Sequence, residues 1–251
     1  MKIVILKKAN IIYLLLIIVI LFIFCFYLIF LDAKPSFSHD IIKNDDKIAY
    51  LTFDDGPTIK ATPKILDVLK EENVKATFFV IGKYVQKHPE IVKREFDEGH
   101  YIANHGYNHD NSKLYKSNDN FLNEIISTDS EIGKAIGIDN YSSHLFRFPN
   151  GYMSPSYKSR KKQVVKLLDS INYSYIDWNC LNKDSEKKYS SEQLLNNLKK
   201  TSKNKGTLIV LMHDTMDVSN SSAVLKASID YLRSEGYEFK NFYDYFPLEK
   251  N

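Results

Sequence analysis

The stretch Ala49-Tyr50-Leu51-Thr52-Phe53-Asp54-Asp55-Gly56-Pro57 joins an apolar segment to a pair of carboxylates. Residues 48–53 are rich in types that favour buried strands, and Gly56-Pro57 is a strong turn signal. The strand is therefore predicted to end where Asp54 and Asp55 stand. Two adjacent carboxylates repel each other unless a cation shares their charge. Taken alone, the stretch has a second interpretation as a solvated Asp-Gly turn.

Strand-like and helix-like segments alternate after this stretch. Regular alternation predicts a mostly parallel sheet with helices outside it. The number of units suits an α/β fold, a distorted (β/α) barrel of about seven parallel strands. We expect strands at 48–53, 76–81, 101–104, 145–148, 173–178, 207–212 and 237–242, and helices at 63–72, 88–98, 121–136, 158–168, 191–200 (with Ser191 as its cap) and 222–234.

The segment 11–31 is apolar and carries no charge. Its length is about the 20 residues that a membrane-spanning helix needs. Lysines precede it and Asp32 follows, which predicts a cytoplasmic N-terminus and an outer domain. A cleaved signal peptide is the alternative, but residues 30–35 show no small-x-small cleavage pattern. We expect an uncleaved, single-pass anchor in the cell membrane. The predicted parts are a cytoplasmic tail 1–10, an anchor 11–31, a linker 32–46, an outer domain 47–246 and a tail 247–251.

The net positive charge of the chain comes entirely from three lysines in its N-terminal tail. The net charge is +3, and without Lys2, Lys7 and Lys8 the remaining 31 basic residues balance 31 acidic ones. A neutral outer part argues against a nucleic-acid partner, because such binders show a basic surplus. The two cysteines are Cys25, inside the apolar run, and Cys180. No disulfide within the outer domain is therefore expected, and we expect a monomer.

Reactive residue types follow the expected strands at their carboxyl ends. Barrels of parallel strands carry their chemistry on the loops after those ends. If the barrel is correct, these residues converge on one face. They are Asp54 and Asp55, His105 and His109, Arg147, Asp177 with Trp178, and His213 with Asp214.

Two histidines four residues apart can present both rings to one ion, although such a pair alone is a weak signal. With one aspartate they form a set of one carboxylate and two imidazoles, which suits a catalytic Zn²⁺ with an open position. Co²⁺, Ni²⁺ or Mn²⁺ also fit such donors. The second aspartate is then free to act as a base toward water. Arg147 could orient that base or form a structural ion pair, and His213 could be a general acid or a buried core histidine.

Together these residues resemble the polysaccharide deacetylases, carbohydrate esterase family 4, whose domain is the NodB homology domain. The resemblance runs from about Lys47 to Phe246. The quoted segments are Thr52-Phe53-Asp54-Asp55-Gly56-Pro57, His105 with His109, Arg147-Phe148-Pro149, and Leu211-Met212-His213-Asp214. The resemblance implies that Asp54 is the catalytic base, Asp55, His105 and His109 hold the metal, Arg147 positions the base, His213 is the catalytic acid and Leu211 lines the acetyl pocket.

The chain departs from the family pattern in two places. Asn150 stands where the third motif usually has a tyrosine, although its backbone N–H survives the change. The fourth motif usually has an aspartate shortly after its tryptophan, Trp178 here, and that aspartate tunes the catalytic histidine. Asp177 and Asp184 both remain candidates for this role. We include Asp177 with the catalytic residues, and Asn150, Trp178 and Leu211 with the substrate-binding ones.

The resemblance implies a metal-dependent hydrolase that removes N-acetyl groups from sugar polymers, acting on carbon–nitrogen bonds other than peptide bonds. With the predicted anchor, peptidoglycan N-acetylglucosamine is the expected substrate. One alternative is a deacetylase of another N-acetylated polysaccharide or of chitin-like oligomers. Another is a surface sugar-binding relative without catalysis.

Overall fold

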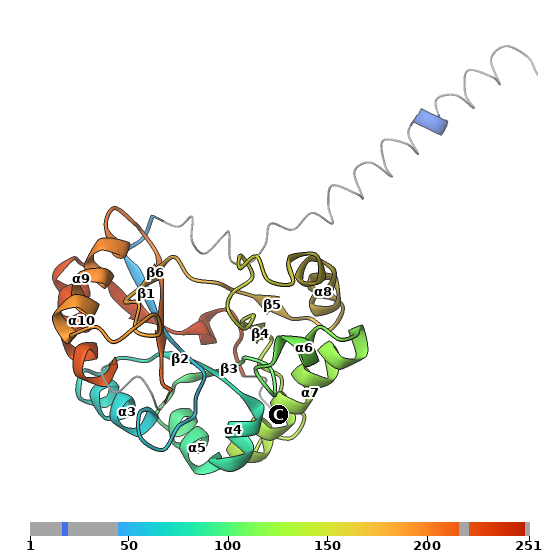
Figure 1. The fold of residues 1–251 in the computed structure, drawn as a ribbon, viewed down its shortest axis with the longest axis horizontal. Helices are drawn as coiled ribbons and strands as arrows, with labels where there is room; N and C mark the ends of the chain where they lie inside the picture. The colour runs from blue at the N-terminus through green and yellow to red at the C-terminus, as the bar shows by residue number, and fades with distance from the viewer. Residues whose placement is uncertain (1–16, 20–44, 216–220, 249–251) are drawn as a thin grey trace, which may run out of the picture. The chain divides into compact units, whose positions relative to one another are not determined.

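A computed structural model describes residues 17–19, 45–215 and 221–248 (Figure 1). By its internal contacts the chain divides into two units, Met1–Ser36 and Phe37–Asn251. The predicted anchor lies outside the described residues except for 17–19. The tail 1–10, residues 32–44 of the predicted linker 32–46 and residues 249–251 of the predicted tail 247–251 also lie outside them. Among the residues described, the structure contains no helix that is both long and apolar enough to cross a membrane.

The larger unit is built on a parallel sheet. Seven strands follow one another in the order β5-β4-β3-β2-β1-β7-β6, and β8 also pairs with β1. The path stops at β5 and β6, so the sheet forms a half-barrel. This confirms the predicted α/β fold with a barrel-like parallel sheet. The strands are β1 Ile48–Asp54, β2 Thr77–Val80, β3 Tyr101–Asn104, β4 Leu145–Phe146, β5 Ser174–Tyr175, β6 Cys180–Leu181, β7 Leu208–His213 and β8 Glu238–Lys240.

Helices follow one another around the outside of the strands, from α9 through α10, α3, α5, α4 and α7 to α8 (Figure 1). Several begin or end at identifiable local signals. α7 ends at Gly137, whose φ of 77° is the left-handed conformation that favours glycine. The helices are α3 Thr62–Glu71, α4 Gly82–Lys87, α5 Pro89–Asp97, α6 Asn111–Leu114, α7 Asn118–Ile136, α8 Lys158–Ser170, α9 Ser191–Ser202 and α10 Ser221–Ser234, with a short 3₁₀ helix η1 at Phe242–Asp244.

The N-cap predicted for α9 is wrong by one residue. Ser190 caps the helix, because its side chain accepts a hydrogen bond from the Gln193 N–H while the Gln193 side chain accepts one from the Ser190 N–H. This reciprocal pair is a capping box. Ser191 is the first residue of the helix itself.

The central strand β1 has two different faces. Ala49, Leu51 and Phe53 pack in the large core that includes buried residues of the helices. On the opposite, inner face, Tyr50 belongs to a small aromatic core with Phe242. Strand alternation then places Thr52 and Asp54 on that inner face, toward the carboxyl end. The inside of the half-barrel is thus apolar at one end and polar at the other.

Candidate active site

β1 ends between Asp54 and Asp55, so only Asp54 belongs to the strand. Asp54 is its last residue, it lies on the inner face, and it is 3% exposed. Asp55 leaves the strand with φ of 78°, which turns its side chain away from the strand's alternation. Asp55 Oδ1 is buried and, among the described residues, has no hydrogen-bond donor. Adjacent carboxylates therefore take different roles.

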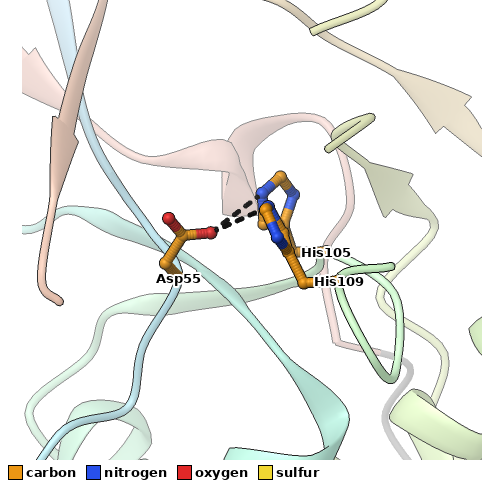
Figure 2. Close-up of side chains that lie close together, drawn as sticks. All are labelled: Asp55, His105 and His109. Atoms are coloured by element: carbon orange, nitrogen blue, oxygen red, sulfur yellow. Dashed lines mark ion pairs between the residues drawn. The ribbon is translucent and has the colours of Figure 1, made fainter. Parts of the chain in front are cut away.

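Asp55 faces the two histidines after β3 (Figure 2). Its Oδ1 lies 3.4 Å from His105 Nε2 and 3.1 Å from His109 Nε2. Ligand atoms from these residues all lie within 4.8 Å of one another. His105 Nδ1 lies 2.7 Å from the Arg147 carbonyl oxygen. That contact places the proton on Nδ1 and leaves the Nε2 lone pair free for a cation.

The electrostatics of this set fit a divalent cation. Burial alone would raise the pKa of Asp55, but the adjacent His105 lowers it well below its usual value, and His109 contributes to the lowering. Burial, together with His105, lowers the pKa of His109. Burial also disfavours charge on His105, yet the Asp54 and Asp55 carboxylates raise its pKa overall. An anionic carboxylate and two imidazoles with donor atoms around one point suit zinc and similar ions. A cation and the His105 proton would compete for that point.

Arg147 fixes Asp54 from inside the half-barrel. Arg147 is completely buried, and its Nη1 donates to Asp54 Oδ1 at 2.8 Å and to Thr52 Oγ1 at 2.7 Å. Its Nε donates to the Ile176 carbonyl at 3.1 Å, and its Nη2 donates to the Asp177 carbonyl at 3.3 Å. A guanidinium held by four acceptors cannot swing away, so Asp54 keeps one orientation. Asp54 Oδ2 remains directed toward the metal-binding set, 3.9 Å from His105 Nε2.

His213 is held by Asp184. Register pairs His213 on β7 with Asp54 on β1, so both side chains occupy the inner face. His213 Nδ1 lies 2.7 Å from Asp184 Oδ1, and the His213 N–H donates to Asp184 Oδ2 at 2.9 Å. Burial lowers the pKa of His213, but Asp184 outweighs this and raises it to about 9. With Nδ1 bonded to a carboxylate, Nε2 carries the proton that the imidazolium can donate.

Of the two aspartates left open by the sequence, Asp184 contacts His213. The prediction that Asp177 is a catalytic residue is wrong in this structure, because both oxygens of its carboxylate accept hydrogen bonds from backbone N–H groups. Asp177 Oδ1 accepts from the Tyr152 N–H at 2.8 Å, and Oδ2 accepts from the Met153 N–H at 3.1 Å. The carboxylate therefore binds the turn after β4.

Two of the three expected substrate-binding residues lie on the same inner face, and the third, Asn150, lies in the turn after β4. Leu211 pairs in register with Thr52, two residues before His213 on β7. Trp178 lies close to Arg147, whose Cζ is 5.8 Å from the ring centroid. Asn150 is exposed, with φ of 62°. The structure thus brings all the predicted site residues to one end of the half-barrel.

Thr52 and Lys161 are two residues of this region that the sequence analysis missed. Thr52 accepts from Arg147, and its position two before Asp54 on one strand face could have indicated this. Lys161 on α8 is 1% exposed and donates to the Gly151 carbonyl at 2.6 Å. It lies on the same helical stripe as buried Val164 and Leu168, where a charged residue is unexpected.

A proton acceptor and a proton donor close to a cation-binding set meet the needs of hydrolysis. The fold and the site together therefore define the protein as a hydrolase with an α/β half-barrel fold. The chain belongs to the polysaccharide deacetylase family, whose model matches residues 42–173.

Relatives and solved structures agree with this assignment. The chain is 35% identical over 212 residues to a peptidoglycan-N-acetylglucosamine deacetylase of Bacillus cereus, covering 80% of this chain and 72% of the relative. It is 36% identical to a protein of that name from Listeria monocytogenes over 78% of this chain but only 38% of the relative. A peptidoglycan-N-acetylmuramic acid deacetylase of Bacillus subtilis is 33% identical, with 79% and 71% covered. The catalytic domain of a peptidoglycan N-acetylglucosamine deacetylase from Eubacterium rectale superposes with a TM-score of 0.73 at 30% identity, covering 84% of this chain and 93% of that one.

Proposed function

We propose that this protein removes the acetyl group from N-acetylglucosamine units of peptidoglycan, releasing acetate and leaving a free amine. The observation that carries the proposal is the pairing of Asp54 with Arg147 and of His213 with Asp184 at the same strand ends as the Asp55–histidine set. The choice of substrate is supported by the relatives that are named peptidoglycan-N-acetylglucosamine deacetylases.

The chain's own residues divide the proton transfers of amide hydrolysis between them. Asp54, oriented by Arg147, takes a proton from the attacking water. His213, protonated with a pKa of about 9, gives a proton to the sugar nitrogen as the carbon–nitrogen bond breaks. The water oxygen and its second proton stay with the acetyl carbon as acetic acid, which then ionises to acetate. The amine leaves neutral, and the reaction consumes one water.

Asp55, His105 and His109 are the residues that would hold the divalent ion, with zinc as the proposed native metal and cobalt, nickel or manganese as substitutes. Such an ion supplies Lewis acidity that polarises the acetamide carbonyl and activates water. The Asn150 N–H is the proposed second stabiliser of the developing oxyanion. No acceptor for it is found within the described residues, whereas the N–H groups of the three residues that follow are all bonded.

The proposal is tested by incubating the purified full-length protein with wall fragments and reading the sugars by mass spectrometry. Loss of acetyl from glucosamine units is expected. Loss only from muramic acid units would move the assignment to the activity for which the Bacillus subtilis relative is named. Activity on another N-acetylated polymer but not on wall fragments would reject peptidoglycan and keep the deacetylase.

We also propose that residues 11–31 anchor the protein in the cell membrane with the catalytic unit outside. The support is the uncharged apolar run and the lysines before it. A linker of about 15 residues reaches at most ~50 Å, which would keep the site near the wall. Cell fractionation tests this. The protein should sediment with membranes and be open to external protease, whereas mature protein in the medium starting near Ala33 would contradict the anchor.

A further inference from the structure

The turn after β4 is bonded at every backbone N–H from Gly151 to Met153. Gly151 N–H donates to the Phe148 carbonyl at 2.7 Å, and the next two N–H groups donate to Asp177. Pro149 has no N–H to offer. The Asn150 N–H is thus the one donor of 149–153 without an acceptor among the described residues, and Asn150 is held at φ of 62°.

Asp177 ties this turn to Arg147. Both oxygens of its carboxylate accept from consecutive N–H groups, at 2.8 and 3.1 Å. Its backbone carbonyl accepts from Arg147 Nη2 at 3.3 Å. Since Arg147 also binds Asp54, the turn and the proposed base are connected through Asp177 and Arg147.

Lys161 holds the same turn from the α8 side. Its Nζ donates to the Gly151 carbonyl at 2.6 Å and to the Ser154 carbonyl at 3.4 Å. Burying an ammonium group carries a desolvation cost, and an apolar residue would fit the stripe formed by Val164 and Leu168. Burial lowers the pKa of Lys161, while the charge of Asp177 opposes that shift. The Lys161 ammonium thus lies buried where it binds two carbonyl oxygens of the turn.

The turn is pressed against Trp178 between these two contacts. A Cβ on Gly151 would lie 2.8 Å from Trp178 Cη2 and 3.6 Å from Asp177 Oδ1. Gly151 also has φ of 79°, which glycine adopts without strain. Little room therefore remains for the turn to shift while both contacts are in place.

We propose that Asp177 and Lys161 are positioning residues that clamp residues 150–154 and so aim the Asn150 N–H at the acetamide oxygen. The inference rests on the proposed function and extends it to residues that touch neither metal nor sugar. An oxyanion donor acts mainly in the transition state, so loosening the clamp should lower kcat more than it changes KM. Losing such a donor outright costs about 10²–10³ in kcat, so a misplaced one should cost about tenfold or more.

The test compares Asp177→Asn and Lys161→Met with Asp169→Asn and Lys162→Met, two exposed positions on α8. In the metal-loaded full-length protein, the first pair should lower kcat about tenfold or more with KM changed less than about twofold. The control pair should match the wild type, and all four variants should bind metal equally. Amide hydrogen exchange gives a readout independent of activity, since Tyr152 and Met153 should exchange about tenfold faster or more in Asp177→Asn.

Several results would overturn the inference. Unchanged exchange at Tyr152 and Met153 would show that Asp177 does not clamp the turn. Faster exchange with unchanged kcat, or a rise in KM alone, would show that the clamp does not serve the reaction. An inactive wild type would remove the proposed function and this inference with it, whereas an active wild type with unchanged variants removes the inference alone. If Lys161→Met does not fold, the Asp177→Asn measurements decide.

Discussion

At the scale of single residues, the site divides two carboxylates that are neighbours in the chain. Asp54 completes the inner face of β1 and binds Arg147, while Asp55 turns out of the strand and faces His105 and His109. The two charges would repel each other if they pointed to one place. Their separation lets one accept a proton while the other binds a cation.

The first prediction concerns the metal. His105→Ala should lower the affinity for zinc more than about 100-fold, since even losing a residue behind a ligand costs about 10–100-fold. Metal content after dialysis, measured by atomic emission, gives the readout, and chelation of the wild type should abolish activity that zinc or cobalt restores. His88→Ala, at the connection of α4 and α5, is the matched control. Full zinc occupancy in His105→Ala would refute the ligand set.

The second prediction concerns pH. Asp184 raises the pKa of His213 to about 9, so the histidine should stay protonated and able to donate up to that pH. In Asp184→Asn the pKa falls, so the alkaline limb of the kcat profile should move to lower pH. The profile is measured at saturating metal.

Asp177→Asn is the control for this shift. It should lower kcat without moving the alkaline limb, because the Asp177 carboxylate binds backbone N–H groups and not His213. An unmoved limb in Asp184→Asn would mean that another group sets it.

At the scale of elements, the third prediction concerns the start of α9. Ser190→Ala should destabilise the protein by about 1 kcal/mol, because the helix loses its capping side chain. Ser191→Ala, one position into the helix, should change the free energy of unfolding by less than about half of that. Both are read by denaturant unfolding. A larger loss from Ser191→Ala would contradict the capping box.

The elements also show what the sequence could predict. Long strands such as β1 and β7 carry buried apolar runs, so their ends, and with them Asp54, Asp55 and His213, could be placed correctly. β6 has only two residues and α6 only four, too few for a periodic pattern. Asp184 lies after β6, so no pattern in the neighbouring sequence could predict that its carboxylate contacts His213. Its contact depends on the pairing of β6 with β7.

At the scale of the whole molecule, Arg147 spans the inside of the half-barrel. It binds Thr52 and Asp54 on β1 and the carbonyls of Ile176 and Asp177 after β5, the last strand at one end of the path. The sequence could place Arg147 at a strand end, but its four acceptors come from segments far apart in the chain. Such a network follows from the curvature of the half-barrel, which brings β1 and the segment after β5 to the same arginine, and not from any local pattern.

We propose that the whole half-barrel serves one reaction, the hydrolysis of an N-acetyl group with Asp54 as the proton acceptor. The most direct measurement is release of free amine from peptidoglycan fragments by the zinc-loaded wild type and by Asp54→Asn, with bound zinc determined in both. We expect release by the wild type and a loss of about 10²–10⁴-fold in kcat for Asp54→Asn at unchanged zinc content, the range for removal of a general base. Equal rates in the two proteins, or no amine release by a wild type that holds its zinc, would contradict this proposal.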